Sequence, residues 1–103
     1  MPRAQNTDKN GQAWSDSDKL RVWKKGSMIT NFSPDIWRRD RYGYVMKYSD
    51  HGDRKSKYGW EIDHINPVSN QGQDDLDNLQ PLYWENNNEK SDTINWKGPN
   101  RNK

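Results

Sequence analysis

The clearest pattern of hydrophobic and polar positions in this chain begins at residue 60 and continues for about thirty residues. Residues 60–65 (WEIDHI) alternate as a β-strand does, and Pro67 ends that run. Residues 70–75 (NQGQDD) show no hydrophobic periodicity and predict a loop rich in turns. Residues 77–83 (DNLQPLY) predict a short second strand at a sheet edge, because Pro81 cannot donate a backbone hydrogen bond. Residues 84–92 (WENNNEKSD) then predict one short helix, so the order is strand, loop, strand, helix.

The pattern before residue 58 is weaker and leaves alternatives open. Residues 20–32 (LRVWKKGSMITNF) predict an irregular hairpin around a central glycine. The stretch 33–40 begins like a short helix at Ser33, Pro34 and Asp35, but 37–40 fit a strand equally well. Residues 40–43 (DRYG) predict a turn, with Gly43 accepting positive φ, and 44–48 (YVMKY) predict a strand.

The two ends of the chain are polar and poor in core-forming residues. We therefore expect a flexible N-terminus over 1–18, one domain over 19–96 with its core at 58–91, and a flexible tail over 97–103. The predicted fold class is α+β, a small single domain with an irregular β/helical extension on its N-terminal side.

Composition changes this picture in two ways. Leu, Ile, Val and Phe make up only 13 of 103 residues, while six Trp and five Tyr supply the missing apolar surface, so we expect an aromatic-rich core. Because the chain has no cysteine, it can have neither a disulfide, nor a Cys-ligated zinc site, nor a thiol nucleophile. Any metal must bind to His, Asp, Glu or Asn, and hard oxygen ligands favour Mg²⁺ or Mn²⁺.

Charge is divided unevenly between the two halves of the chain. Residues 1–60 hold 13 Lys and Arg against 7 Asp and Glu, whereas residues 61–103 hold 4 against 8. A basic half attracts anions and an acidic half holds cations, which together suit a polyanionic substrate and a metal site. The first 15 residues lack the apolar centre of a signal peptide, and no apolar run is long enough to cross a membrane. We expect a cytoplasmic protein without membrane contact, with delivery into another cell as an alternative.

His64, Asn78 and Asn87 carry the candidate chemistry. Thirteen residues separate the first two and eight the last two, which is enough for a loop, a strand and a helix to bring all three together. Cleavage of a phosphodiester needs an activated water and positive charge beside the phosphorus. A neutral imidazole can take the proton of that water. Asp63 and an amide oxygen of Asn87 could hold one divalent cation, with coordination positions left for water and substrate.

One geometric condition follows from the neighbouring positions of Asp63 and His64. Adjacent side chains of a regular strand point to opposite faces. Either the strand breaks near His64, before Pro67, or the metal and the water straddle the strand end.

The motifs EIDHINP (61–67), DNLQPL (77–82) and WENNNEK (84–90) resemble the HNH endonucleases, the His-Me finger or ββα-metal class. The resemblance covers about residues 58–90 and gives an HNN variant, with Asn87 where many members carry His. It implies a ββα-metal fold, His64 as general base, one Mg²⁺ or Mn²⁺ on Asp63 and Asn87, and Asn78 bracing the loop through backbone hydrogen bonds. WRRDRYG (37–43) is similar to an upstream element that is a cysteine knuckle in many HNH proteins. Its lack of cysteine implies aromatic packing in place of a structural zinc.

Basic residues near the motif are the candidate contacts to nucleic acid. Most of them are interleaved with aromatic residues, as is common where phosphates are bound, although such runs are also ordinary solvated surface. The candidates are Arg38, Arg39, Arg41, Lys55, Lys57 and Lys90. Lys90 is singled out because it follows Asn87 by three residues and should share its helix face.

The expected function is hydrolysis of phosphodiester bonds in DNA with low sequence specificity, and RNA stays open as a second substrate. A partner protein could supply targeting, or act as an immunity protein if the chain is the nuclease domain of an antibacterial effector toxin. The alternative from another class is a nucleic-acid-binding module that keeps the fold without catalysis.

Overall fold

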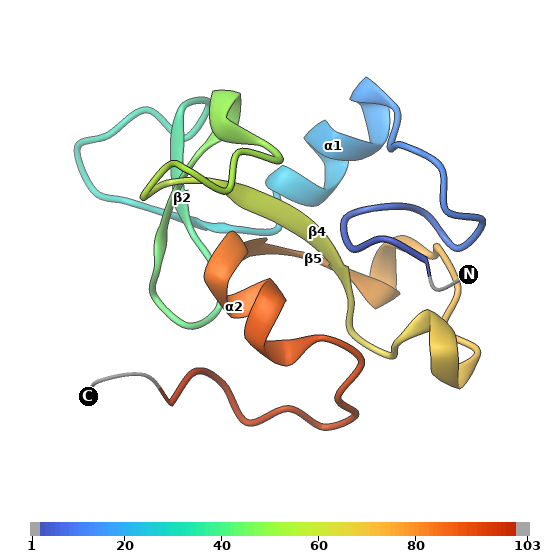
Figure 1. The fold of residues 1–103 in the computed structure, drawn as a ribbon. Coiled ribbons are helices and arrows are strands. Elements are labelled where there is room, and N and C mark those ends of the chain that lie inside the picture. The colour runs from blue at the N-terminus through green and yellow to red at the C-terminus, as the bar shows by residue number, and fades with distance from the viewer. Residues whose placement is uncertain (1–2, 101–103) are drawn as a thin grey trace.

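A computed structural model describes residues 3–100 of the chain. It confirms an α+β domain with two antiparallel sheets (Figure 1). The elements in chain order are α1 (Asp16–Trp23), β1 (Ser27–Met28), β2 (Trp37–Arg39), β3 (Val45–Lys47), β4 (Trp60–His64), β5 (Leu79–Tyr83) and α2 (Trp84–Lys90). Three short 3₁₀ turns lie between them.

Helix α1 was not predicted, and the expected hairpin over 20–32 is wrong, because its first residues are helical and its one strand, β1, pairs with β2. The helix begins after Ser15, whose side-chain oxygen accepts a hydrogen bond from the backbone N–H of Asp18. Acidic residues in the first turn favour its N-terminus through the helix dipole. The helix buries Val22 and Trp23, so tertiary packing decides the conformation of a segment whose sequence is mostly polar.

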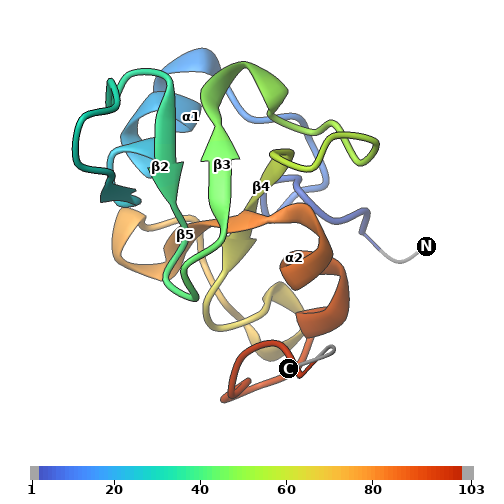
Figure 2. The ribbon, with the colours of Figure 1, turned by 90° about the vertical axis from the view of Figure 1, so that its left-hand side faces the viewer.

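Strands β1, β2 and β3 form one antiparallel sheet in that spatial order. The ambiguous stretch 33–40 therefore becomes strand β2, preceded by a turn in which Trp37 N–H donates to the carbonyl of Ser33. The predicted turn between β2 and β3 is present, with Gly43 at φ +87°. Figure 2 shows β2 and β3 side by side, with β5 leading into α2.

Strands β4 and β5 form a separate two-stranded antiparallel sheet, and α2 follows β5 without a break. Their register pairs His64 with Leu79 and Ile62 with Pro81, in agreement with an edge position for that proline. β4 ends at His64, before Pro67, which agrees with the first of the two alternatives drawn from the adjacency of Asp63 and His64. Both strands are buried along their whole length, because the helices and the other sheet cover their faces. These three elements form the ββα unit of the predicted fold.

The hydrophobic core is rich in tryptophan, as composition predicts. Trp23 and Trp60 lie with ring centroids 5.1 Å apart, and Tyr48 contacts both rings. The buried cluster consists of Trp14, Val22, Trp23, Met46, Trp60, Ile62 and Leu79. This cluster lies between α1 and the β4–β5 sheet. Met46 of β3 belongs to it and joins the β1–β2–β3 sheet to the β4–β5 sheet.

The segment before α1 is in contact with the rest of the domain. Asn6 Oδ1 accepts the backbone N–H of Ile62 at 2.8 Å, and Trp14 is buried in the core. In Figure 1 this dark-blue segment passes beside the end of β4. The flexibility expected for 1–18 and 97–103, and the domain boundaries drawn from it, stay predictions, and residues 1–2 and 101–103 lie outside the described part.

Candidate active site

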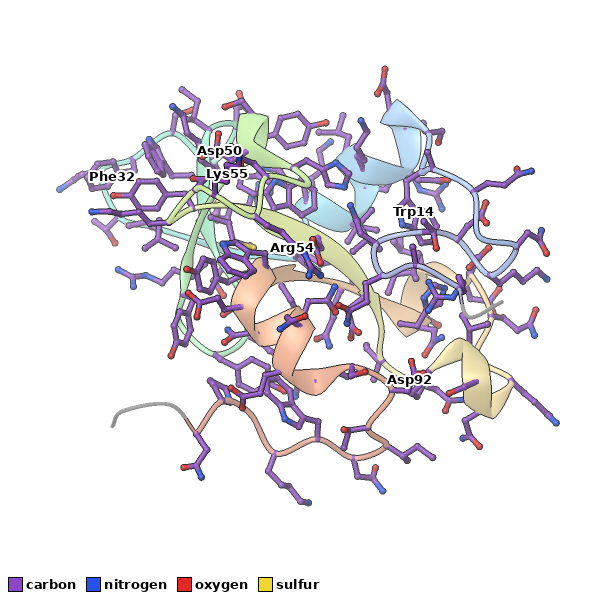
Figure 3. The ribbon with its side chains drawn as sticks, in the orientation of Figure 1. Trp14, Phe32, Asp50, Arg54, Lys55 and Asp92 are labelled. Carbon is purple, nitrogen blue, oxygen red and sulfur yellow. The ribbon has the colours of Figure 1, made fainter. Side chains whose placement is uncertain are left out.

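His64, Asp63 and Asn87 line one small hollow at the end of β4. Its volume is about 20 Å³, which is room for about one water molecule. Two other lining residues, Ser91 and Asp92, are exposed, so the hollow opens to the surface just after α2. Figure 3 shows Asp92 at this turn. The structure thus brings together the predicted general base and the two predicted metal ligands.

The imidazole of His64 is held in place by a partner that was not predicted. His64 Nε2 lies 2.7 Å from Asp74 Oδ1, and Asp74 also accepts the backbone N–H of Lys9 at 3.0 Å. A carboxylate can only accept, so Nε2 carries the hydrogen and Nδ1 is the nitrogen free to take a proton. Trp14 packs beside the ring at a centroid distance of 5.7 Å. Asp74 and Trp14 together fix both the tautomer and the orientation of the ring.

Asn78 makes the bracing contacts that the resemblance implies. Its Oδ1 accepts the backbone N–H of Asn66 at 2.8 Å, and its Nδ2 donates to the carbonyls of Asn66 and Gln73 at 3.1 and 2.8 Å. Both ends of the amide are therefore used within the loop that joins β4 to β5. These hydrogen bonds hold the loop, which is built of turns and short 3₁₀ segments, in a fixed conformation and so keep Asp74 in contact with His64.

Asn87 is buried in α2, and its amide is oriented by Glu61 of β4. Asn87 Nδ2 donates to Glu61 Oε1 at 2.8 Å. Because the carboxylate can only accept, the amide nitrogen must face it, and the amide oxygen is the end left for a cation. Arg54 in turn donates to both oxygens of Glu61, at 2.7 and 2.8 Å. Figure 3 shows Arg54 between β4 and α2.

Asp63 is buried and has two protein partners. Gln80 Nε2 donates to its Oδ2 at 2.8 Å, and Lys90 Nζ lies 3.2 Å from its Oδ1. Burial raises the pKa of Asp63 above the usual range, and the ammonium of Lys90 offsets part of that rise. A carboxylate oxygen keeps a second lone pair after one hydrogen bond, so Asp63 can still be a ligand.

The residues around the hollow fit a magnesium-type ion rather than a site made of many carboxylates. Within residues 3–100, no cluster of three or more His, Cys, Asp or Glu could hold a metal. Asp63 and Asn87 instead offer one carboxylate and one amide oxygen at the same hollow. Mg²⁺ is commonly held by one or two carboxylates with its remaining positions filled by water and phosphate. The donor set therefore fits the ion expected from the sequence.

The predicted contacts to nucleic acid divide into two groups. Arg39, Arg41, Lys55 and Lys57 are exposed and accessible to a polyanion. Arg38 instead donates to the carbonyls of Pro34, Lys24 and Gly26, which ties the end of α1 to β2. Lys90 is only 3% exposed, and its ammonium donates to Asp63 and to the carbonyl of His64. The placement of Arg38 and Lys90 supports structural roles and gives no support to phosphate binding.

A buried carboxylate occupies the region where the sequence suggested a replaced cysteine knuckle. Asp40 accepts the backbone N–H groups of Tyr42, Tyr44 and Tyr83 and the side-chain amide of Asn86, at 2.8 to 3.0 Å. The predicted aromatic packing is also present, since Tyr44 and Tyr83 stack with centroids 5.4 Å apart. This network joins the β2–β3 turn to α2, and the sequence pattern pointed only to its aromatic part.

Comparison with known proteins finds no curated protein and no solved structure that matches the chain. In residues 3–100 no helix is both long and apolar enough to cross a membrane.

Residues 49–93, a little under half of the chain, match the family model described as HNH endonuclease. The matched segment contains β4, the bracing loop, β5 and α2, and with them all four residues of the predicted motif. Such a domain indicates nuclease activity on nucleic acid in general, typically with a divalent metal. Through this segment, the chain is similar to the HNH endonuclease family.

Proposed function

We propose that this protein is a metal-dependent endonuclease that hydrolyses phosphodiester bonds in DNA with low sequence specificity. The observation that carries the proposal is the common hollow of His64, Asp63 and Asn87. A proton acceptor and two oxygen ligands that line one hollow support the proposal, because this hydrolysis requires both at the same phosphate. The proposed ion is one Mg²⁺ or Mn²⁺.

In the proposed mechanism, His64 takes a proton from the attacking water through Nδ1, while Asp74 holds Nε2. The water oxygen forms a bond to phosphorus, and the bond from phosphorus to the 3′ oxygen breaks. The products are a 5′-phosphate and a 3′-hydroxyl, whose proton comes from solvent. Asp63 and Asn87 would hold the divalent ion, which when bound supplies positive charge beside the phosphorus and the leaving oxygen. Asn78 keeps the loop that carries this geometry in place.

The contacts around Asp63 favour one alternative, a non-catalytic nucleic-acid-binding module. Lys90 already neutralises Asp63, and a second donor from Gln80 occupies its other oxygen. A divalent ion must share the carboxylate of Asp63 with both donors, so the electrostatic attraction between the ion and Asp63 is weaker.

Cleavage of supercoiled plasmid by the wild type and His64→Ala, each with and without Mg²⁺, separates the two functions. The endonuclease loses about a thousandfold or more of its metal-dependent rate in His64→Ala, while DNA binding persists. Excess chelator abolishes cleavage by the wild type, and added Mg²⁺ or Mn²⁺ restores it. Binding without any cleavage by the wild type in the presence of metal would establish the non-catalytic module instead.

A further inference from the structure

Lys90, a candidate for phosphate contact in the sequence, does not line the hollow. Lys90 is directed into the protein, where its ammonium lies 3.2 Å from Asp63 Oδ1 and 3.0 Å from the carbonyl oxygen of His64. Only 3% of the residue is exposed. A phosphodiester is much larger than the 20 Å³ hollow, so it has to lie across the opening. Residues at the rim are therefore the ones that can contact it.

The N-terminal segment places another cation, Arg3, at this hollow. Arg3 lines it together with Asp63, His64 and Asn87, and it is half-buried. No other arginine or lysine does so among the described residues 3–100. Arg3 thus lies beside both the proposed proton acceptor and the proposed metal ligands.

The guanidinium of Arg3 is anchored at one nitrogen. Nη1 donates to the carbonyl and the hydroxyl of Thr7, at 2.9 and 3.1 Å, and to the carbonyl of Ala4 at 3.1 Å. Within residues 3–100, Nε and Nη2 have no hydrogen-bond partner. A guanidinium with one fixed end and two remaining donors suits a phosphate oxygen pair, which it can bind in a bidentate way.

The segment that carries Arg3 is fastened to the elements of the site itself. Gln5 Nε2 donates to the carbonyl of Asn87 at 2.8 Å, and its Oε1 accepts from Arg54 at 2.8 Å. Asn6 Oδ1 accepts the backbone N–H of Ile62 in β4. These three contacts fix the position of Arg3 relative to Asp63 and Asn87 before substrate binds, which is the condition for an effective phosphate contact.

We propose that Arg3 binds the phosphodiester at the opening of the hollow and is a substrate-binding residue of the nuclease. This inference rests on the proposed function for its catalytic consequence, but the phosphate contact itself can be measured without cleavage. It also gives the N-terminal segment a part in the active site, outside the matched family segment.

The test compares Arg3→Ala and Arg3→Lys with Arg21→Ala, which removes an exposed arginine from α1. For Arg3→Ala, kcat/KM for DNA cleavage should fall roughly ten- to a hundredfold, and Arg3→Lys should recover part of the loss. Mn²⁺ affinity measured by electron paramagnetic resonance and the melting temperature should stay at wild-type values. Arg21→Ala should cleave at nearly the wild-type rate.

A second measurement separates failure of this inference from failure of the proposed function. DNA binding is titrated over a range of salt concentrations in a His64→Ala background, with and without Arg3→Ala. The slope of log K against log salt is negative, and loss of one phosphate contact should make it less negative by about 0.9. If the wild type does not cleave but the slope changes, the phosphate contact stands and the nuclease proposal falls. An unchanged slope overturns the inference, as does unchanged or increased cleavage by Arg3→Ala, the increase identifying the segment as a cover over the site.

Discussion

The amide of Asn87 has two ends, and only its oxygen can bind a cation. Glu61 decides which end faces the hollow, because it accepts the amide nitrogen at 2.8 Å and is only 3% exposed. Arg54 holds Glu61 in turn through both carboxylate oxygens. Partners of this kind, which orient a metal ligand without touching the metal, commonly change metal affinity by an order of magnitude or more.

Glu61→Gln should therefore weaken Mn²⁺ binding by about tenfold. The substituted amide can present its own nitrogen to Asn87, which then turns its oxygen away from the hollow. The dissociation constant for Mn²⁺, measured by electron paramagnetic resonance, checks this expectation. Asp35→Asn serves as the matched control, since it also removes one carboxylate charge but at an exposed position. Equal Mn²⁺ affinity in a folded Glu61→Gln protein would show that Glu61 does not orient the ligand.

Among the larger elements, the β2–β3 turn and helix α2 are joined by a single carboxylate. Asp40 is 2% exposed, and it accepts two backbone groups of the turn, the N–H of Tyr83 and the amide of Asn86. All four groups donate hydrogen bonds to the buried carboxylate of Asp40. The network therefore stabilises both the negative charge and the position of α2. α2 in turn carries Asn87, so the position of this proposed metal ligand depends on the hairpin.

Asp40→Asn should lower the free energy of unfolding by about 2 to 4 kcal/mol. The new amide nitrogen cannot accept, so the donors at one of the two positions lose their hydrogen bonds to residue 40: either the backbone N–H groups of Tyr42 and Tyr44, or Tyr83 N–H and the Asn86 side chain. Urea unfolding followed by tryptophan fluorescence gives the measurement. Asp53→Asn is the control, because its carboxylate accepts the backbone N–H of Lys55 in an exposed turn and should cost less than about 1 kcal/mol. Similar losses in the two variants would refute a central role for Asp40.

The elements that could be predicted are those whose signals are local. β4, β5 and α2 follow from alternation, from Pro81 and from a contiguous motif, and the bracing amide of Asn78 acts within 12 residues of itself. Helix α1 was missed although Ser15 and the acidic first turn are helix-start signals, because its eight residues bury only Val22 and Trp23. A short helix with so little apolar surface depends on tertiary contacts that its own sequence does not contain.

The partners of the site residues could not be predicted for a different reason. Gln5 and Asn87, which are joined by a hydrogen bond, are 82 residues apart in sequence. Helix periodicity predicted a common face for Asn87 and Lys90, and both side chains do contact residues of β4. Periodicity cannot say, however, whether the ammonium points to solvent or inward. Sequence spacing therefore identified the candidate site residues themselves. The residues that surround them, Glu61, Arg54, Asp74 and Arg3, could be recognised only from burial and long-range contacts in the structure.

At the scale of the whole molecule, the N-terminal segment contacts the candidate site, β4 and the edge of the core. Lys9 N–H contacts Asp74, Gln5 contacts α2, and Asn6 contacts both β4 and His51. His51 Nε2 lies 3.1 Å from Asn6 Oδ1, which already accepts the N–H of Ile62. The ring also contacts Trp60 of the core at a centroid distance of 4.8 Å. His51 therefore lies where the N-terminal segment, β4 and the core meet.

Burial lowers the pKa of His51 to about 4, with a smaller contribution from Lys19 and an opposing one from Glu61. The neutral ring is thus favoured in the folded state, whereas the unfolded chain takes up a proton below its ordinary pKa of about 6.5. Stability contributed by His51 is complete above pH 6.5 and is lost progressively as the pH falls to about 4. Allowing for partial exposure of the ring, the loss of unfolding free energy should be about 1 to 2 kcal/mol.

His51→Gln keeps a donor for Asn6 but cannot titrate. Urea unfolding at pH 4.5 and 7.5 should therefore show a smaller pH dependence of stability for His51→Gln than for the wild type. If the two proteins lose the same stability between these pH values, protonation of His51 does not couple to the packing of the N-terminal segment.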